Sequence, residues 1–246
     1  MFEASQLMAK YGVKAIFSDR HGGVSEGAYS SLNLGESVGD TNECVAQNLI
    51  RLCQSSDMPM PHQSQQVHGV QVLYCQGDGV RHSENADILI ATNSGVALAV
   101  RTADCLPVVL VDIEAGVVAA VHAGWRGTAQ NVVGVALDAM CSKGAYPAHI
   151  LASFGPCIAN CCFAVSAEVA DILSQSCGVD VGVMQGGQVF ADLAKANRHQ
   201  LLARGVKHAC IEISQPCTYC SVQPRYFSYR RDCGKTGRQL TMISLP

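Results

Sequence analysis

The chain has 246 residues, a length that suits one large domain, and 48% of them are hydrophobic, which is enough for a sizeable core. A net charge of −3 and the lack of a basic block argue against nucleic acid as a partner. The longest apolar run, Leu106–Val121, is interrupted by Asp112 and Glu114 and falls short of the ~20 residues of a membrane span, so we predict no membrane association.

The thirteen cysteines bear on the cellular compartment. The first residues, Met1–Ser5, lack the basic and apolar regions of a secretory signal, so we predict a cytoplasmic protein. Thiols stay reduced in the cytoplasm, and an odd number of cysteines also fits poorly with complete pairing. We therefore expect free thiols and no disulfide framework.

The N-terminal third of the chain is predicted to alternate strands with loops. Ala15–Phe17 is a short strand that runs into the glycine-rich loop Ser18–Gly27. A capping box, Asp40–Glu43, predicts the start of a helix. Alternating residues then predict a strand over Gln66–Tyr74, which would carry His68, and apolar residues predict another over Ala86–Ala91.

The middle of the chain is rich in β-branched residues. It predicts strands over Gly95–Val100, Leu106–Val111 and Gly116–Val121, with Thr102–Cys105 as a tight connection between the first two. The segment Gly124–Thr128 then leads into a helix. The apolar face of that helix is Val132, Val133, Ala136, Leu137 and Met140.

The C-terminal part mixes both element types. Strands are predicted over Ala148–Phe154 and Val206–Ile213, and helices over Ser166–Ser176 and Asp192–Arg204. An aromatic and basic segment, Tyr226–Asp232, follows. We predict a single domain over residues 1–246, of the α+β class, with a mixed β-sheet sandwich flanked by helices.

Three residues from separate segments suggest a metal site. Cys105 and His122 lie at opposite ends of one apolar pair of strands, and His68 follows Gln66-Val67. One thiolate and two imidazoles supply three zinc ligands and leave a fourth position for water or substrate, as in catalytic zinc sites. Taken singly, however, each of the three is more typical of a buried core residue.

The same residues allow a second interpretation. Cys105 as nucleophile and His122 as base, with Asp104 or another acid to orient the histidine, form a cysteine-hydrolase arrangement. His68 distinguishes the two interpretations, because a Cys–His pair does not need it and a third zinc ligand does. A third, non-enzymatic interpretation is metal binding or redox buffering, which only the cysteine count suggests.

Candidate anion contacts lie in three places. The glycine-rich turn Gly124–Thr128 with Arg126 precedes a helix, whose free N–H groups suit phosphate. Arg20 lies in the N-terminal glycine-rich loop, and Arg230 in the C-terminal segment. An ordinary strand–helix turn and solvated surface arginines are the alternative interpretations.

Further cysteines occur in two segments, Cys157–Cys162 and Cys217–Cys220. Cys217-Thr218-Tyr219-Cys220 has the spacing of a structural zinc site, but no second pair of the same spacing accompanies it. We interpret these cysteines as buried, reduced thiols.

Several motifs in one order resemble a known family. Thr102-Ala103-Asp104-Cys105-Leu106-Pro107-Val108 and His122-Ala123-Gly124-Trp125-Arg126-Gly127-Thr128 are the most specific of them. Together with Arg20–Gly27, Gln66–Gly69 and Phe227–Asp232 they closely resemble the laccase-domain family, named for multicopper polyphenol oxidase activity and now regarded as purine nucleoside-processing enzymes. The resemblance covers nearly the whole chain.

The resemblance implies a zinc ion held by His68, Cys105 and His122. It implies purine nucleosides and phosphate as substrates, through phosphorolysis of adenosine, inosine or methylthioadenosine and deamination of adenosine. Some bacterial members are linked to editing of muramyl-nucleotide precursors of peptidoglycan, which is the amidohydrolase alternative. The family fold is an αββα-like sandwich related in outline to cysteine-hydrolase toxins.

Further roles follow from combining the resemblance with the residues. We expect Arg20, Arg126 and Arg230 to bind phosphate, Asn33 to contact sugar or base, and Asp104 or Asp87 to carry a proton. Copper is the alternative metal and copper polyphenol oxidation the second alternative function, but a site with several coppers fits poorly with eight scattered histidines. The sequence predicts no particular oligomeric state.

Overall fold

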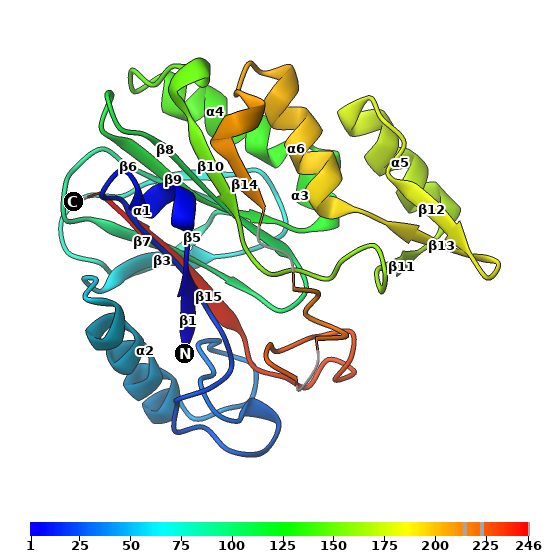
Figure 1. The fold of residues 1–246 in the computed structure, drawn as a ribbon. Helices are drawn as coiled ribbons and strands as arrows, with labels where there is room; N and C mark the ends of the chain where they lie inside the picture. Colours follow the sequence, from blue (N-terminus) through cyan, green and yellow to red (C-terminus); the bar gives the residue numbers. More distant parts are fainter. Residues whose placement is uncertain (214–215, 222–223, 246) are drawn as a thin grey trace.

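The computed structural model describes residues 1–213, 216–221 and 224–245. Two mixed β-sheets are stacked face to face, with helices on both outer faces (Figure 1). This arrangement confirms the predicted α+β class and the sandwich flanked by helices.

The first sheet has the strand order β1-β2-β15-β7-β3-β5. The first four strands pair with one another in antiparallel fashion, whereas β3 is parallel to both β7 and β5. The strands are β1 (Phe2–Ala4), β2 (Lys14–Ser18), β3 (Pro61–Gln65), β5 (Arg81–Asn85), β7 (Ala97–Thr102) and β15 (Gln239–Ser244).

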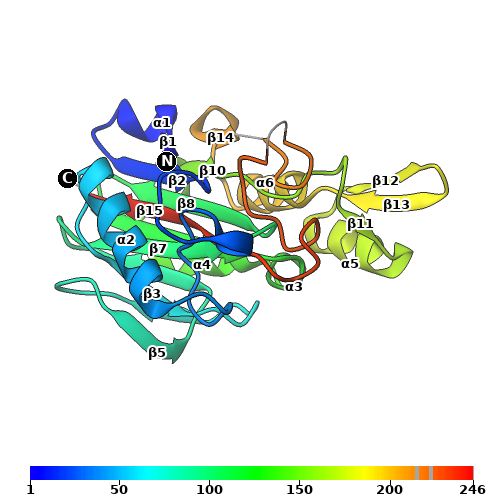
Figure 2. The same cartoon turned by 90° about the horizontal axis from the view of Figure 1, so that it is seen from below.

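The second sheet has the order β14-β10-β8-β9-β6-β4 and is also mixed. Its strands are β4 (Val72–Tyr74), β6 (Ile88–Ala91), β8 (Leu106–Asp112), β9 (Val117–Ala123), β10 (Leu151–Phe154) and β14 (Ile211–Ile213). A small third sheet, β11-β13-β12, ends in a hairpin that projects from the molecule (Figure 2). It consists of β11 (Ala164–Val165), β12 (Gly182–Gln185) and β13 (Gln188–Ala191).

The helices are α1 (Gln6–Ala9), α2 (Asn42–Ser56), α3 (Trp125–Ala129), α4 (Val132–Cys141), α5 (Ala167–Cys177) and α6 (Leu193–Ala203). Single turns of 3₁₀ helix occur at Gly27–Tyr29, Pro147–His149 and His208–Cys210. Among the described residues, no helix has the length and apolarity to cross a bilayer.

Three apolar clusters separate the four layers. The cluster between the sheets includes Phe17 and Val100 of the first sheet and Val109 of the second. A second cluster packs the outer face of the second sheet against α3, α4 and α6. A third packs α2 onto the outer face of the first sheet. The site described below lies at one end of this sandwich, where loops from both sheets meet.

Strands β8 and β9 form the centre of the second sheet because both of their faces are apolar and fully buried. They pair in antiparallel fashion, with Leu106 opposite Ala123 and Pro107 opposite His122. The start of β8 and the end of β9 therefore lie at the same edge of the sheet. This pairing brings Cys105, one residue before β8, next to His122.

Three predicted strands are wrong in extent. The predicted strand Ala148–Phe154 begins only at Leu151, because a 3₁₀ turn at Pro147–His149 precedes it. The predicted strand Gln66–Tyr74 is a strand only over Val72–Tyr74, and His68 lies in a loop with a left-handed backbone, φ +62°. The predicted strand Val206–Ile213 is reduced to Ile211–Ile213, because a 3₁₀ turn at His208–Cys210 precedes it. In all three segments, contacts made by distant residues or by a local turn override the local sequence pattern.

Candidate functional site

Three segments bring His68, Cys105 and His122 together. His122 ends β9, Cys105 ends the connection between β7 and β8, and His68 projects from the loop between β3 and β4. Their ligand atoms all lie within 4.8 Å of one another, and Cys105 Sγ is 3.7 Å from His68 Nε2. The two imidazole rings meet edge to face, with centroids 4.8 Å apart.

The fully buried Asp87 holds two of these side chains in place. Its carboxylate accepts hydrogen bonds from the backbone N–H groups of Val67, His68 and Gly69, at 2.8–3.1 Å. The same carboxylate accepts from Nδ1 of His122 at 2.7 Å, which leaves Nε2 of His122 free for a ligand. These hydrogen bonds give Asp87 a positioning role, and the proton transfer expected of Asp104 or Asp87 stays a prediction.

Asp104 has a structural environment as well. Its oxygens accept from Thr218 Oγ1 at 2.6 Å and from the backbone N–H of Arg230 at 2.7 Å. Its backbone has φ +92°, a conformation that costs a non-glycine residue of order 1–3 kcal/mol. These contacts fix the turn that presents Cys105, and Asp87, not Asp104, is the acid that orients His122.

The electrostatics favour a thiolate at Cys105. Burial raises the pKa of the Cys105 thiol, but the charge of His122 and hydrogen bonds from His122 and His68 outweigh burial and lower it. Burial likewise lowers the pKa of His122, and the charge of Cys105 and the Asp87 hydrogen bond outweigh it and raise the pKa. A thiolate beside two imidazoles is the form in which these residues bind metals.

Zinc fits this donor set. One sulfur and two nitrogens are the ligands that zinc accepts in sites with an open fourth position. The backbone also leaves room for the cluster, because a Cβ on Gly124 would lie 2.8 Å from His68 Cδ2 and 3.1 Å from Cys105 Sγ. Only glycine at position 124 lets both ligands approach this turn.

The cluster opens into a cavity of about 590 Å³, a size that suits a small-molecule ligand. Two aromatic rings, Phe163 and Tyr229, line it. Its walls also include Gln65, Gln66, Thr102, Ala103 and Ile158, together with the loop Gly35–Val38.

Four arginines, Arg81, Arg101, Arg230 and Arg238, also line the cavity. Burial, together with the charges of Arg81 and Arg238, lowers the pKa of Arg101 to about 10, although the charge of Glu36 opposes this shift. Mutual repulsion between these guanidinium groups is relieved by an anion, so the wall is suited to phosphate. Of these four arginines, only Arg230 is predicted from the sequence as a phosphate contact. The other three lie on strands and loops that come together only in the folded protein.

Three of the predicted substrate contacts are not among the described residues that line the cavity. Asn33 is fully buried, and its amide binds Asp40 and the backbone of Gly35 and Arg238. Arg20 stacks on Phe227 with its Cζ 4.7 Å from the ring centroid. The structure thus gives Asn33 a structural environment and sets Arg20 apart from the cavity wall.

Arg126 is the third of these residues. Its Cζ lies 4.4 Å from the centroid of the Trp125 ring, on the short helix α3. That helix has only five residues, Trp125–Ala129, and a separate helix α4 begins after Asn131. The turn itself still lies at the site, because Gly124 adjoins His68 and Cys105.

The additional cysteines, interpreted from the sequence as buried, reduced thiols, are buried only in part. The sulfurs of Cys161, Cys162, Cys217 and Cys220 lie within 4.8 Å of one another, and Cys161 and Cys220 are exposed. The fold brings together a pair of adjacent cysteines and a Cys-X-X-Cys pair, a combination that sequence spacing did not reveal.

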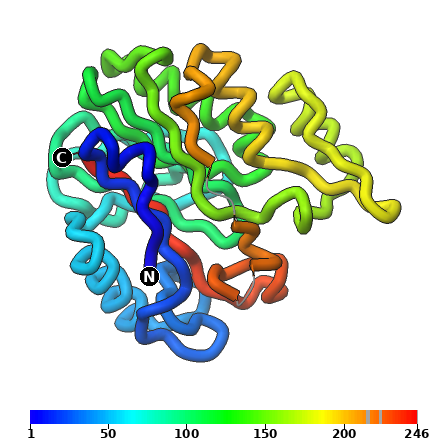
Figure 3. Tube along the Cα trace, in the orientation of Figure 1, coloured from blue at the N-terminus to red at the C-terminus, as the bar shows by residue number. Residues whose placement is uncertain are grey.

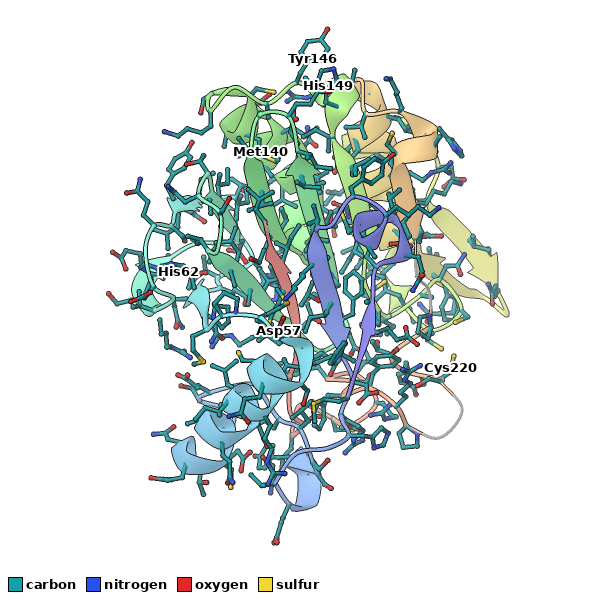
Figure 4. The ribbon with its side chains drawn as sticks, turned by 60° about the vertical axis from the view of Figure 1, so that its left-hand side comes forward. Asp57, His62, Met140, Tyr146, His149 and Cys220 are labelled. Carbon is teal, nitrogen blue, oxygen red and sulfur yellow. The ribbon has the colours of Figure 1, made fainter. Side chains whose placement is uncertain are left out.

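A third group, His62, Cys75 and His82, is also compact. Both ring nitrogens of His62 are engaged, by His82 at 2.9 Å and by the carbonyl of Gly77 at 3.3 Å. These hydrogen bonds account for both ring nitrogens of His62 without a metal ion. Figure 4 shows His62 and Cys220 on opposite sides of the molecule, so the group of His62, Cys75 and His82 is separate from the four-cysteine group.

Comparison with known proteins identifies relatives over nearly the whole chain. The chain is 38% identical over 233 residues to a purine nucleoside phosphorylase of Deinococcus radiodurans, covering 94% of this chain and 88% of the relative. It is 34% identical over 249 residues to adenosine deaminase RL5 of an unknown prokaryotic organism, covering 94% of each. The crystal structure of YlmD from Geobacillus stearothermophilus superposes with a TM-score of 0.87 at 34% identity, covering 98% of this chain and 94% of that one.

The family described as multi-copper polyphenol oxidoreductase laccase matches residues 14–246, a range that contains the three clustered ligands and the arginine-lined cavity. Sequence match, fold and relatives agree, and the chain belongs to this laccase-domain family.

Proposed function

We propose that this protein is a zinc-dependent enzyme that cleaves purine nucleosides with phosphate, with deamination of adenosine as a second activity of the same site. The observation that carries the proposal is the cluster of His68, Cys105 and His122 at a cavity lined by four arginines. A cationic wall next to a metal-ligand set is suited to a reaction between an anion and a neutral nucleoside. Relatives named as purine nucleoside phosphorylase and adenosine deaminase support it.

In phosphorolysis, a phosphate oxygen forms a bond to C1′ of the ribose while the bond between C1′ and the purine nitrogen breaks. The purine leaves with the electron pair of that bond and takes up a proton. Zinc, when bound, supplies a Lewis acid or an activated water at this site. The protein residues have to hold the phosphate and the nucleoside in line, which is the larger part of such catalysis.

The cavity residues suit these tasks. Arg81, Arg101, Arg230 and Arg238 are placed to hold phosphate through paired guanidinium N–H groups. Phe163 and Tyr229 offer ring faces for the purine. Asp87 fixes the loop of His68 and the ring of His122 by accepting hydrogen bonds from both, and so orients two of the metal ligands.

The direct test compares wild type with Cys105→Ala. We expect wild type to bind zinc at this cluster and to release adenine from adenosine only when phosphate is present. Cys105→Ala should lose that zinc and the activity together, measured by elemental mass spectrometry and by chromatography of the products. Cys44→Ala, which removes a partly exposed thiol on α2, is the matched control and should retain both. Wild type that releases no purine with or without phosphate would refute the proposal.

If the arginines of the cavity wall bind phosphate, replacing one of them should raise KM for phosphate more than KM for adenosine. Arg230→Gln removes one guanidinium from the cavity wall, so KM for phosphate should rise about tenfold, equivalent to about 1.4 kcal/mol. KM for adenosine should change much less. Arg198→Gln, which changes a partly exposed arginine on α6 outside the cavity wall, is the control. Equal increases in both constants would assign Arg230 to the nucleoside instead of phosphate.

A second candidate function rests on the same residues without metal. Cys105, His122 and Asp87 form the order nucleophile, base and orienting acid of a cysteine hydrolase. In that reaction the sulfur attacks an amide carbonyl of a nucleotide-linked peptide such as a muramyl precursor, the C–N bond breaks, and the amine leaves with a proton from His122. Water then hydrolyses the thioester on Cys105 to the carboxylic acid and the free thiol. A covalent adduct on Cys105 with a thiol-directed substrate analogue, together with turnover that survives chelation, would favour this function. Loss of turnover on chelation without any adduct would exclude it.

A further inference from the structure

Four cysteines lie outside the site described above, and two chain segments bring them together. Cys161 and Cys162 belong to the connection between β10 and β11, and Cys217 and Cys220 follow β14. The two segments run side by side, with an isolated bridge between Cys157 and Cys217 and a hydrogen bond from the N–H of Thr218 to the carbonyl of Cys157 at 3.0 Å. In Figure 3 the orange chain after β14 lies against the green chain after β10.

The spacing of the sulfurs matches a tetrahedral metal site. All four sulfurs lie within 4.8 Å of one another, and those of Cys161 and Cys220 are 3.6 Å apart. Four Zn–S bonds of ~2.3 Å in a tetrahedron separate neighbouring sulfurs by about 3.8 Å. A disulfide requires ~2.05 Å between sulfurs and joins only two of the four.

The surroundings also suit a thiolate set. The backbone N–H of Ala159 donates to Cys217 Sγ at 3.4 Å, the kind of contact that supports a metal-bound sulfur. Cys217 is buried, Cys162 is partly buried, and Cys161 and Cys220 are exposed, so burial in an apolar core does not account for the group. Figure 4 places Cys220 at the outer edge of the molecule.

We propose that Cys161, Cys162, Cys217 and Cys220 bind a structural zinc ion, distinct from the ligand set of His68, Cys105 and His122. With four protein ligands the site is closed, as structural zinc sites are, and takes no part in binding substrate. Its effect is to join the connection after β10 to the connection after β14. This proposal does not depend on the nucleoside chemistry proposed above.

The structural zinc also steadies one wall of the cavity. Thr218, between two of the ligands, donates its hydroxyl to Asp104 at 2.6 Å, and Asp104 adjoins Cys105. Phe163, next to Cys162, lines the cavity itself. Residues on both segments thus depend on the four-cysteine group for their position, although none of its ligands needs to touch the substrate.

The first experiment counts zinc by elemental mass spectrometry on the full-length protein. Cys220→Ser and Cys105→Ala should each carry one zinc per chain fewer than wild type, and the double variant two fewer. Cys44→Ser, on α2, should match wild type. Zinc that is unchanged in folded Cys220→Ser, or completely lost in Cys105→Ala, would overturn the proposal.

Two further measurements need no change to the four cysteines. Cobalt added to metal-depleted Cys105→Ala should give the absorption spectrum of a tetrahedral four-thiolate complex. In the second measurement, mass spectrometry follows the alkylation of Cys161 and Cys220. Alkylation of these thiols should be at least about tenfold slower in the zinc-containing protein than after chelation. The exposed Cys233 serves as internal control and should react equally in both. A disulfide between Cys161 and Cys220 in protein that still contains its zinc would refute a zinc site. Equal alkylation of these cysteines before and after chelation would refute it as well.

Discussion

At the scale of single residues, one carboxylate organises two segments of the site. Asp87 is fully buried and satisfies the N–H groups of the His68 loop and Nδ1 of His122 at the same time. A buried charge is stable only when such partners surround it. The left-handed backbone of His68 is therefore maintained by a residue in the connection between β5 and β6, and the sequence around His68 alone gives no sign of it.

Asp87→Asn tests this positioning role. An amide cannot accept all four hydrogen bonds, so we expect zinc affinity to fall about 10–100-fold, as for other outer-shell partners. A competitive chelator titration measures the affinity. Asp78→Asn, at an exposed position, should behave as wild type. An unchanged affinity in Asp87→Asn would show that the loop and His122 hold their positions without the carboxylate.

Gly124→Ala tests the close approach of the turn to the ligands. The added methyl group would lie 2.8 Å from His68 and 3.1 Å from Cys105, so one ligand has to move. We expect loss of zinc from this cluster and at least about a tenfold loss of kcat, since misplacement by ~1 Å has large kinetic effects. Gly182→Ala, with its nearest contacts at 3.4 Å, is the matched control and should leave both unchanged. Full activity in Gly124→Ala would contradict a rigid turn.

At the scale of elements, the accuracy of the sequence predictions follows the origin of each signal. The strands around Leu110 and Ala119 are predicted well, because both faces are buried and their apolar runs are local. The helix after Asp40-Thr41 is predicted well because its cap is local too: Thr41 Oγ1 accepts from the N–H of Cys44 at 3.2 Å. The four-cysteine group was misjudged, because its two halves meet only through the pairing of Cys157 with Cys217.

The cap of α2 gives a prediction about stability. Thr41→Ala leaves the N–H of Cys44 without its side-chain partner, which costs about 1 kcal/mol at a helix N-terminus. For a chain of this size, Tm should fall by about 2–4 °C in calorimetry. Thr92→Ala, at an exposed position in a loop, should change Tm by less. Because α2 packs on the outer face of the first sheet, the zinc content should not change.

At the scale of the whole molecule, one carboxylate links the N-terminal segment to the second sheet. Glu212 on β14 accepts from Ser5 Oγ, from Ser153 Oγ at 2.7 Å, and from the N–H groups of Gln6 and Leu7 at 3.0 and 3.1 Å. Burial raises the pKa of Glu212, but these hydrogen bonds outweigh it and hold the pKa below its usual value of 4.5. The ionised form therefore stabilises the folded protein.

The lowered pKa sets the direction of the pH dependence. Because the folded protein binds the Glu212 proton less tightly than the unfolded chain, this stabilisation is fully present above about pH 4.5 and is lost as the pH falls through the folded pKa. Glu212→Gln should be destabilised by about 1 kcal/mol at pH 7. The difference in Tm between Glu212→Gln and wild type should become smaller as the pH falls below about 4.5. Glu84→Gln, at an exposed position, should show no such convergence. A deficit that is constant with pH would assign the effect to packing.

The first sheet places its last strand in the middle. Strand β15 lies between β2 and β7, so the N-terminal strands join the rest of the sheet only through Gln239–Ser244. Strand β15 is synthesised after every other strand of the two sheets, and until then β2 lacks the neighbour that joins it to β7. During synthesis the emerging chain therefore presents unpaired strand edges, which favour aggregation. The cavity arginine Arg238 precedes β15 directly, so the binding site is completed only in this final step of assembly.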